Sequence, residues 1–167
     1  MSVSTIDADG VPDSRMLVLK DLTADGTWCF AGRRDSTKGI ELGTRPVAAL
    51  LFYWRELVRS VRIRGPIVEG SSDEARADFT ARSLEARAVA LSGQQGTLVT
   101  TATDLAHDVD TAAKRLAADP NLAPEEWVIW KLDPTEVEFW QGSATRLHTR
   151  LRYQRGVSGW DVVQLRP

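Results

Sequence analysis

Two groups of strand-like segments enclose a helical block in this chain, and this order constrains the fold more than any other feature. Residues 47–54 form a nearly continuous apolar run, and residues 59–68 alternate apolar side chains with arginines, as half-buried strands do. After Gly70, alanine, glutamate and arginine dominate and favour helices up to residue 118. Strand-like segments then return. The order predicts a mainly β fold with helices (α+β), an antiparallel Greek-key-like barrel with helices packed on one side.

Local signals set the expected boundaries. A strand at 3–6 runs into an Asp- and Gly-rich hairpin turn at 7–10, and the next strand, 14–20, should end before Asp25–Gly26 and pair with 27–31. Helices are expected at 36–44, 71–82, 85–91 and 104–118, with Ser36, Ser71 and Thr103 at their starts. The last strands are expected at 127–132, 135–140, 147–154 and 160–165.

Length and composition limit the classes of function. A chain of 167 residues suits a single domain spanning 1–167. Its net charge of -2 gives no general attraction to nucleic acid, and no apolar run is long enough to span a membrane, so the expected location is the cytoplasm. The lone Cys29 excludes an intrachain disulfide, and two distant histidines, His107 and His148, predict no metal site.

The segment from Glu138 to Arg150 combines an aromatic ring with fixed positive charge. It contains Trp140, followed closely by Arg146, His148 and Arg150. Strand alternation would direct these last three side chains to one side, where they would bind an anion and handle a proton. The competing interpretation is an edge strand with a solvated basic face.

A second anion site is expected near the N-terminus. Residues 15–20 form a strand-like segment with Arg15 and Lys20 at its ends. Ser36 is a good N-cap, and the free N–H groups of the helix that follows it, with the Thr37 hydroxyl and the Lys38 ammonium, suit a phosphate dianion. The chain contains no glycine-rich phosphate loop, so side chains and a helix start would hold the phosphate.

These motifs together resemble the pyridoxamine 5′-phosphate oxidase family, whose members are FMN-dependent split-barrel oxidases. The resemblance runs from Met1 to Pro167. Its motifs, in the family's order, are Arg-x-x-x-Leu-Lys at 15–20, Ser-x-Lys-Gly at 36–39, Phe-Tyr-Trp at 52–54, Val-Arg-Ile-Arg-Gly-Pro at 61–66 and the block from Glu138 to Arg150.

The resemblance implies FMN as the cofactor and a homodimer in which both subunits contribute to each flavin site. The implied cofactor-binding residues are Arg15, Met16, Leu17, Val18, Leu19, Lys20, Phe30, Ala31, Thr37, Lys38, Ser60, Gln94, Gln95, Trp140 and Arg150. From pattern alone, Phe30 and Ala31 would be strand core, and Gln94 and Gln95 would lie in a polar loop.

The resemblance also implies the substrate and the reaction. A ring substrate would stack on the flavin with its phosphate held by Lys20 and Arg82, while Arg146, Leu147 and His148 cover its reactive face. Arg146 and His148 are the expected catalytic residues. A hydride would pass from C4′ of pyridoxine or pyridoxamine phosphate to flavin N5, and dioxygen would reoxidise the flavin and yield hydrogen peroxide. This activity belongs to vitamin B6 metabolism and yields pyridoxal phosphate.

Several positions depart from the family pattern. Ser60 stands where glutamine is usual, Thr37 where arginine is usual, and Gln94–Gln95 where Gln-Ser is usual. At the substrate phosphate, Asp78 and Ala86 replace a tyrosine and a serine, and a carboxylate that faced a phosphate would repel it. The sequence begins within the first expected strand, so the helical segment that usually precedes it in the family is expected to be either truncated or absent.

Two alternatives therefore remain open. One is a flavin oxidase of the phenazine-biosynthesis type that acts on a tricyclic substrate, which the altered phosphate-site residues favour. The other is a flavin-binding protein without turnover.

Overall fold

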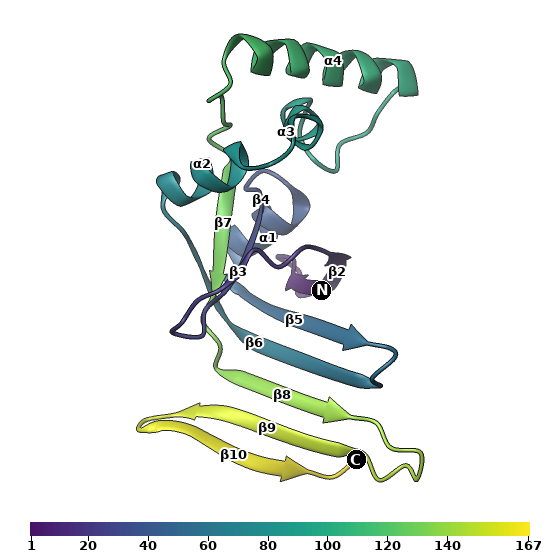
Figure 1. The fold of residues 1–167 in the computed structure, drawn as a ribbon, viewed down its shortest axis with the longest axis vertical. Helices are drawn as coiled ribbons and strands as arrows, with labels where there is room; N and C mark the ends of the chain where they lie inside the picture. The colour runs from purple at the N-terminus through teal and green to yellow at the C-terminus, as the bar shows by residue number, and fades with distance from the viewer.

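Strand β6 (Arg59–Glu69) organises the sheet because it pairs with three other strands. It pairs antiparallel with β5 (Val47–Trp54) along its length up to Pro66. Its other partners divide it: residues 59–64 pair with β8 (Glu136–Gln141), and residues 67–69 pair with β7 (Trp127–Leu132). The strands therefore diverge from β6 in two directions (Figure 1).

The computed structural model describes residues 1–167 as ten strands in one antiparallel sheet and four helices. One path through the sheet runs β10-β9-β8-β6-β5-β1-β2, and β7 joins β4 and β3 to the other end of β6. The remaining elements are β1 (Ser2–Ile6), β2 (Pro12–Met16), β3 (Asp21–Leu22), β4 (Trp28–Arg33), β9 (Thr149–Gly156), β10 (Gly159–Leu165), α1 (Thr37–Thr44), α2 (Ser72–Thr80), α3 (Leu84–Leu91) and α4 (Ala102–Ala118). The predicted class, an antiparallel β fold with helices, is confirmed.

Gly65 allows strands β7 and β8 to leave β6 in different directions. The turn between β7 and β8 crosses β6 at this residue, where the Asp133 N–H donates to the Pro66 carbonyl and the Thr135 N–H donates to the Arg64 carbonyl. A Cβ atom on Gly65 would lie 2.0 Å from the Asp133 carbonyl oxygen. The crossing therefore requires the absence of a side chain at this position.

The main core lies inside the sheet and is built from the alternate apolar residues of the strands. It contains Val3, Phe30, Leu42, Ala48, Leu50, Val61, Ile63, Ile67, Val128, Trp130 and Leu132. Phe30 and Trp130 pack with ring centroids 5.5 Å apart, which joins β4 to β7. Smaller clusters attach α2 to β7 through Phe79 and Trp127, and α3 to α4 through Ala88 and Leu116.

Helices α2, α3 and α4 gather at one end of the molecule, and β8, β9 and β10 form the opposite end (Figure 1). Ser71 caps α2 in a capping box with Glu74, and Ser36 caps α1, both as predicted. The cap of α4 is Thr101 and not Thr103, so this helix begins earlier than expected. No helix combines the length and apolar character needed to cross a membrane.

Two predicted strands were wrong in extent. The strand expected at 14–20 ends at Met16 and pairs with β1, while the short strand β3 pairs with β4 instead. The strand expected at 147–154 begins only at Thr149, because residues 142–148 form a turn in which Arg146 has a φ of 67°. Arg146 and His148 therefore do not share a strand face with Arg150.

We expect Gly65→Ala to lower the free energy of unfolding by about 2–3 kcal/mol, because the added methyl overlaps a backbone carbonyl that the crossing fixes. Gly43→Ala is the matched control, since a Cβ on Gly43 meets nothing within 4 Å in helix α1. It should raise stability by about 0.5–1 kcal/mol, the helix preference for alanine. Chemical denaturation measures both, and equal effects would contradict the assigned role of Gly65.

Candidate functional site

A cavity of about 900 Å³ lies between the β2–β3 segment, the start of α1 and the α3–α4 region. We call it the main cavity. It brings together many of the residues predicted to bind cofactor or substrate: Met16, Leu17, Val18, Lys20, Ala31, Lys38, Arg82, Gln94 and Gln95. These residues come from segments far apart in the sequence. The side chain of Phe30 instead lies in the main core, and Leu19 and Thr37 are not among the lining residues.

Lys38 places a buried positive charge in the main cavity. Only 4% of its surface is exposed, and its Nζ donates to Ser36 Oγ at 3.0 Å and to Gln95 Oε1 at 2.7 Å. Burial, and then the positive charge of Arg15, lower the pKa of Lys38 to about 8. No carboxylate forms an ion pair with it, so this ammonium is available to an anionic ligand.

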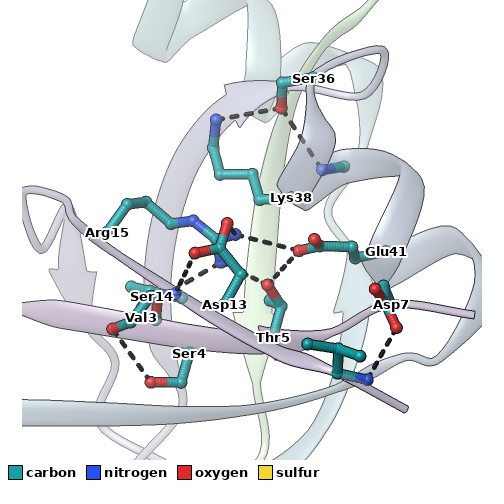
Figure 2. Close-up of polar contacts among 12 residues, drawn as sticks. Val3, Ser4, Thr5, Asp7, Asp13, Ser14, Arg15, Ser36, Lys38 and Glu41 are labelled. Atoms are coloured by element: carbon teal, nitrogen blue, oxygen red, sulfur yellow. Dashed lines mark hydrogen bonds and ion pairs between the residues drawn. The ribbon is translucent and has the colours of Figure 1, made fainter. Parts of the chain in front are cut away.

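Arg15 has a different environment from the one predicted. Figure 2 shows its guanidinium among Asp13, Thr5 and Glu41, below the Lys38 side chain. It pairs with Asp13 at 2.7 Å and with the buried Glu41 at 3.0 Å, and it also donates to the Thr5 hydroxyl. Two carboxylates therefore already satisfy the charge of Arg15, so it is not free to bind a phosphate as predicted. The sequence analysis missed Glu41, whose position on a helix face three residues after Lys38 gave no sign of this pair.

The start of α1 is held against the α3–α4 loop. Ser36 Oγ accepts the Gly39 N–H and donates to the Arg33 carbonyl, and the Gln94 amide donates to the Asp35 carbonyl at 2.6 Å. Gln95 binds Lys38, so both glutamines of the loop fix this helix start. The Lys38 ammonium is thus fixed at the start of α1 and lines the cavity, an arrangement suited to a phosphate.

The other end of the main cavity holds Lys20 and Arg82. Lys20 forms an ion pair with Asp78 at 2.8 Å, and the second carboxylate oxygen of Asp78 accepts the Trp127 indole N–H at 2.9 Å. The Arg82 guanidinium lies over the Trp127 ring, 4.5 Å from its centroid. Asp78 therefore contacts two residues that line the cavity, Lys20 and Trp127, although it is not a lining residue itself.

A second group of predicted residues lies across three neighbouring strands. Ser60, Trp140 and Arg150 are direct partners on β6, β8 and β9, so their side chains share one sheet face. They line a pocket of about 370 Å³, which we call the strand-face pocket. Arg150 and Arg62 both pair with the buried Glu138, at 2.8 and 2.6 Å. Glu138 was not predicted as a site residue, although it opens the motif.

The 142–148 turn carries the predicted catalytic residues beside this pocket. His148 Nδ1 accepts the Ser143 N–H at 3.0 Å, and its ring centroid lies 5.1 Å from that of Trp140. Because Nδ1 is the acceptor, neutral His148 carries its proton on Nε2, which remains a donor. Leu147 is exposed on the same turn.

One chain does not bring the two groups together. The main cavity and the strand-face pocket share no lining residue. Helices α3 and α4 supply much of the lining of the first, whereas the second is lined from β5, β6, β8 and β9. Figure 1 shows α3 and α4 at the end of the molecule opposite to β8 and β9. A ligand that needs both groups requires a second copy of the chain.

Comparison with protein families decides the relationship. A family model described as pyridoxamine 5′-phosphate oxidase matches residues 1–141, and one described as the pyridoxine 5′-phosphate oxidase C-terminal dimerisation region matches residues 127–167. The chain belongs to the pyridoxamine 5′-phosphate oxidase family. The resemblance carried by the motifs is thereby confirmed, and the strand-face pocket lies partly within the matched dimerisation region.

Individual relatives agree with this assignment. Pyridoxine/pyridoxamine 5′-phosphate oxidases of Burkholderia vietnamiensis and Hyphomonas neptunium are 39% and 37% identical, over the whole of this chain and 78% and 77% of theirs. The crystal structure of PhzG from Burkholderia lata, in complex with tetrahydrophenazine-1-carboxylic acid, is 30% identical with a TM-score of 0.92, covering 99% of this chain and 81% of that one. A related FMN-binding protein from Nostoc punctiforme, 19% identical, covers 99% of this chain and 86% of its own and shares the fold with a TM-score of 0.80.

We expect the buried charge of Lys38 to destabilise the ligand-free protein, so Lys38→Met should raise the free energy of unfolding by about 1–2 kcal/mol near neutral pH. Between its folded pKa of about 8 and its ordinary value of 10.5, the unfolded chain binds more protons than the folded one. Wild-type stability should therefore rise with pH in this window, and the advantage of the variant should shrink. Denaturation at several pH values measures this.

The control is Lys114→Met, which removes an exposed lysine paired with Asp110. Its effect should stay within about 0.5 kcal/mol and show no such pH trend. If Lys38→Met lowered the free energy of unfolding at neutral pH, it would contradict the claim that the buried Lys38 ammonium destabilises the ligand-free protein.

Proposed function

We propose that the protein is an FMN-dependent oxidase, active as a homodimer whose flavin sites each combine the main cavity of one subunit with the strand-face pocket of the other. The observation that carries the proposal is the buried Lys38 ammonium beside a helix start, with no carboxylate partner of its own. Membership of the pyridoxamine 5′-phosphate oxidase family supports FMN as the ligand.

The residues of the main cavity fit the phosphate of FMN. Lys38 and the free N–H groups at the start of α1 would bind the phosphate, while Arg15, already paired with Asp13 and Glu41, would stay behind them. Ala31, Met16 and Val18 line the cavity with apolar surface for the ring system. When bound, FMN would supply the hydride acceptor, which dioxygen reoxidises to give hydrogen peroxide.

The partner subunit would supply the second half of the site. Trp140 offers an aromatic surface, and Arg150 is held in place by Glu138. The family match that is described as a dimerisation region covers both residues, which supports a site shared between subunits. Ser60 lies in the same row and offers a hydroxyl.

Arg146, Leu147 and His148 would cover the substrate on the reactive side of the flavin. The His148 ring lies beside Trp140, and its free Nε2–H can donate a hydrogen bond to the substrate. Arg146 would orient an electronegative group on the substrate ring. These roles concern the substrate rather than the cofactor phosphate.

Two oxidase activities compete for the substrate assignment. One is oxidation of pyridoxine or pyridoxamine phosphate, as in relatives that are 37–39% identical. The other is oxidation of a phenazine-type ring, which is favoured by the Lys20–Asp78 ion pair where a substrate phosphate would bind. Anaerobic mixing with each substrate class distinguishes them, and flavin binding without reduction by either would indicate a binding protein without turnover.

We predict that variants of the two groups separate cofactor binding from catalysis. Lys38→Ala should weaken FMN binding by about 1.5–3 kcal/mol, the loss of a charge-assisted hydrogen bond, and wild-type protein should prefer FMN to riboflavin. Arg146→Ala and His148→Ala should leave FMN affinity nearly unchanged and slow flavin reduction by roughly ten- to a thousandfold. Fluorescence titration and anaerobic stopped-flow absorbance measure the two effects.

Equal affinity for FMN and riboflavin would refute the phosphate site. Loss of flavin from Arg146→Ala as severe as from Lys38→Ala would show that the 142–148 turn binds the cofactor instead of the substrate.

A further inference from the structure

A carboxylate lies directly behind the lining of the main cavity at its substrate end: Asp78 is not itself a lining residue, but it binds the lining Lys20, the lysine that would receive a phosphate. The Asp78 side chain is 15% exposed, and both of its carboxylate oxygens have partners. One pairs with Lys20 Nζ at 2.8 Å, and the other accepts a hydrogen bond from Trp127 Nε1 at 2.9 Å. Trp127 is itself buried against Phe79 on the same helix as Asp78. The position of Asp78 is therefore set by packing, and its charge cancels that of Lys20.

Arg82 is the cation that remains without a carboxylate at this end. Its guanidinium stacks on the Trp127 ring, and its one hydrogen bond is a 3.4 Å contact to the Ala86 carbonyl. Its Nε is buried without a partner. Stacking thus fixes the orientation of the Arg82 guanidinium, which still has N–H donors free to bind a ligand.

Further negative charge lies around the same cavity. Asp104 and Asp108 on α4 are among its lining residues, while the lining Arg33 is already paired with Asp35 at 2.6 Å. Lys20 and Asp78 together contribute no net charge, so Arg82 supplies the positive charge at the substrate end that has no carboxylate partner. Lys38 supplies positive charge at the other end of the cavity, where the cofactor phosphate would bind.

From this arrangement we propose that Asp78 is a specificity-determining residue, which selects a ring substrate anchored by a singly charged carboxylate and excludes one anchored by a phosphate dianion. The inference rests on the proposed oxidase function and names the class of substrate for that same site.

The balance of charges explains the selection. A phosphate dianion would compete with Asp78 for Lys20. If the phosphate displaced Asp78, a largely buried carboxylate would be left unpaired beside a doubly negative group. A carboxylate needs only the two parallel donors of the Arg82 fork and leaves the Lys20–Asp78 pair intact. The site therefore discriminates by repulsion as well as by attraction.

The test compares two ligands that share a ring and differ in the anion. We would titrate the FMN-loaded protein with 1-naphthoate and with 1-naphthyl phosphate by calorimetry at about pH 7.5, where the phosphate is mostly doubly charged. Wild-type protein should bind the carboxylate at least about threefold more tightly. Asp78→Asn keeps an oxygen acceptor for Trp127 and frees Lys20, so it should tighten phosphate binding at least about tenfold and reverse the preference.

Two further variants make the test specific. Lys20→Met combined with Asp78→Asn should return phosphate binding to near the wild-type level, because the freed ammonium is gone. Asp73→Asn removes a carboxylate from the same helix that forms no ion pair with Lys20, and it should leave the ratio of the two affinities unchanged.

A wild-type protein that prefers the phosphate would overturn the inference, and this measurement needs no variant to fold. An unchanged affinity ratio in folded Asp78→Asn would overturn it as well. Failure of the proposed function would appear earlier and differently, as a protein that does not bind FMN or whose flavin no substrate reduces.

Discussion

The division of one edge of strand β6 between β7 and β8 determines how the two groups of candidate site residues are separated. One half of β6 pairs with β8 and the other with β7, and the turn that joins those strands crosses at Gly65 with no room for a side chain. As a result β4 and β7 carry the main cavity toward the helices, while β8 and β9 carry Trp140 and Arg150 away from it. The split of the sheet is the structural reason for proposing a site shared between two subunits.

Within the main cavity, the chain maintains a positive charge at an energetic disadvantage. Burial beside Arg15 lowers the pKa of Lys38 to about 8, and only neutral oxygens of Ser36 and Gln95 contact its ammonium. By contrast, Arg15, Lys20 and Arg150 each have a carboxylate partner. A cation left without a counterion among so many paired ones is typical of a site that awaits an anionic ligand.

Local signals in the sequence predicted the elements that depend on them. The apolar runs at 47–54 and 127–132 coincide with β5 and β7, and Ser36 and Ser71 cap the helices expected of them. Order along the chain also predicted the fold class, because strands that bracket a helical block have few ways to bury their faces.

Tertiary contacts determined the features that the sequence did not predict. Alternation predicted a strand through Arg146 and His148, but the chain turns there and His148 accepts a hydrogen bond from Ser143. The ion pairs Arg15–Glu41 and Lys20–Asp78 join residues far apart in sequence, so no local pattern could assign them. The motifs identified which residues form the two groups, whereas their separation within one chain became visible only in the fold.

A mixed dimer tests the shared site most directly. One subunit would carry Lys38→Ala and the other Arg150→Ala, a change that leaves Glu138 paired with Arg62. If each flavin site uses Lys38 of one subunit and Arg150 of the other, the mixed dimer retains one unaltered site. It should bind one FMN per dimer with wild-type affinity, while both parent homodimers bind weakly. A mixed dimer that binds no better than its parents would contradict the account.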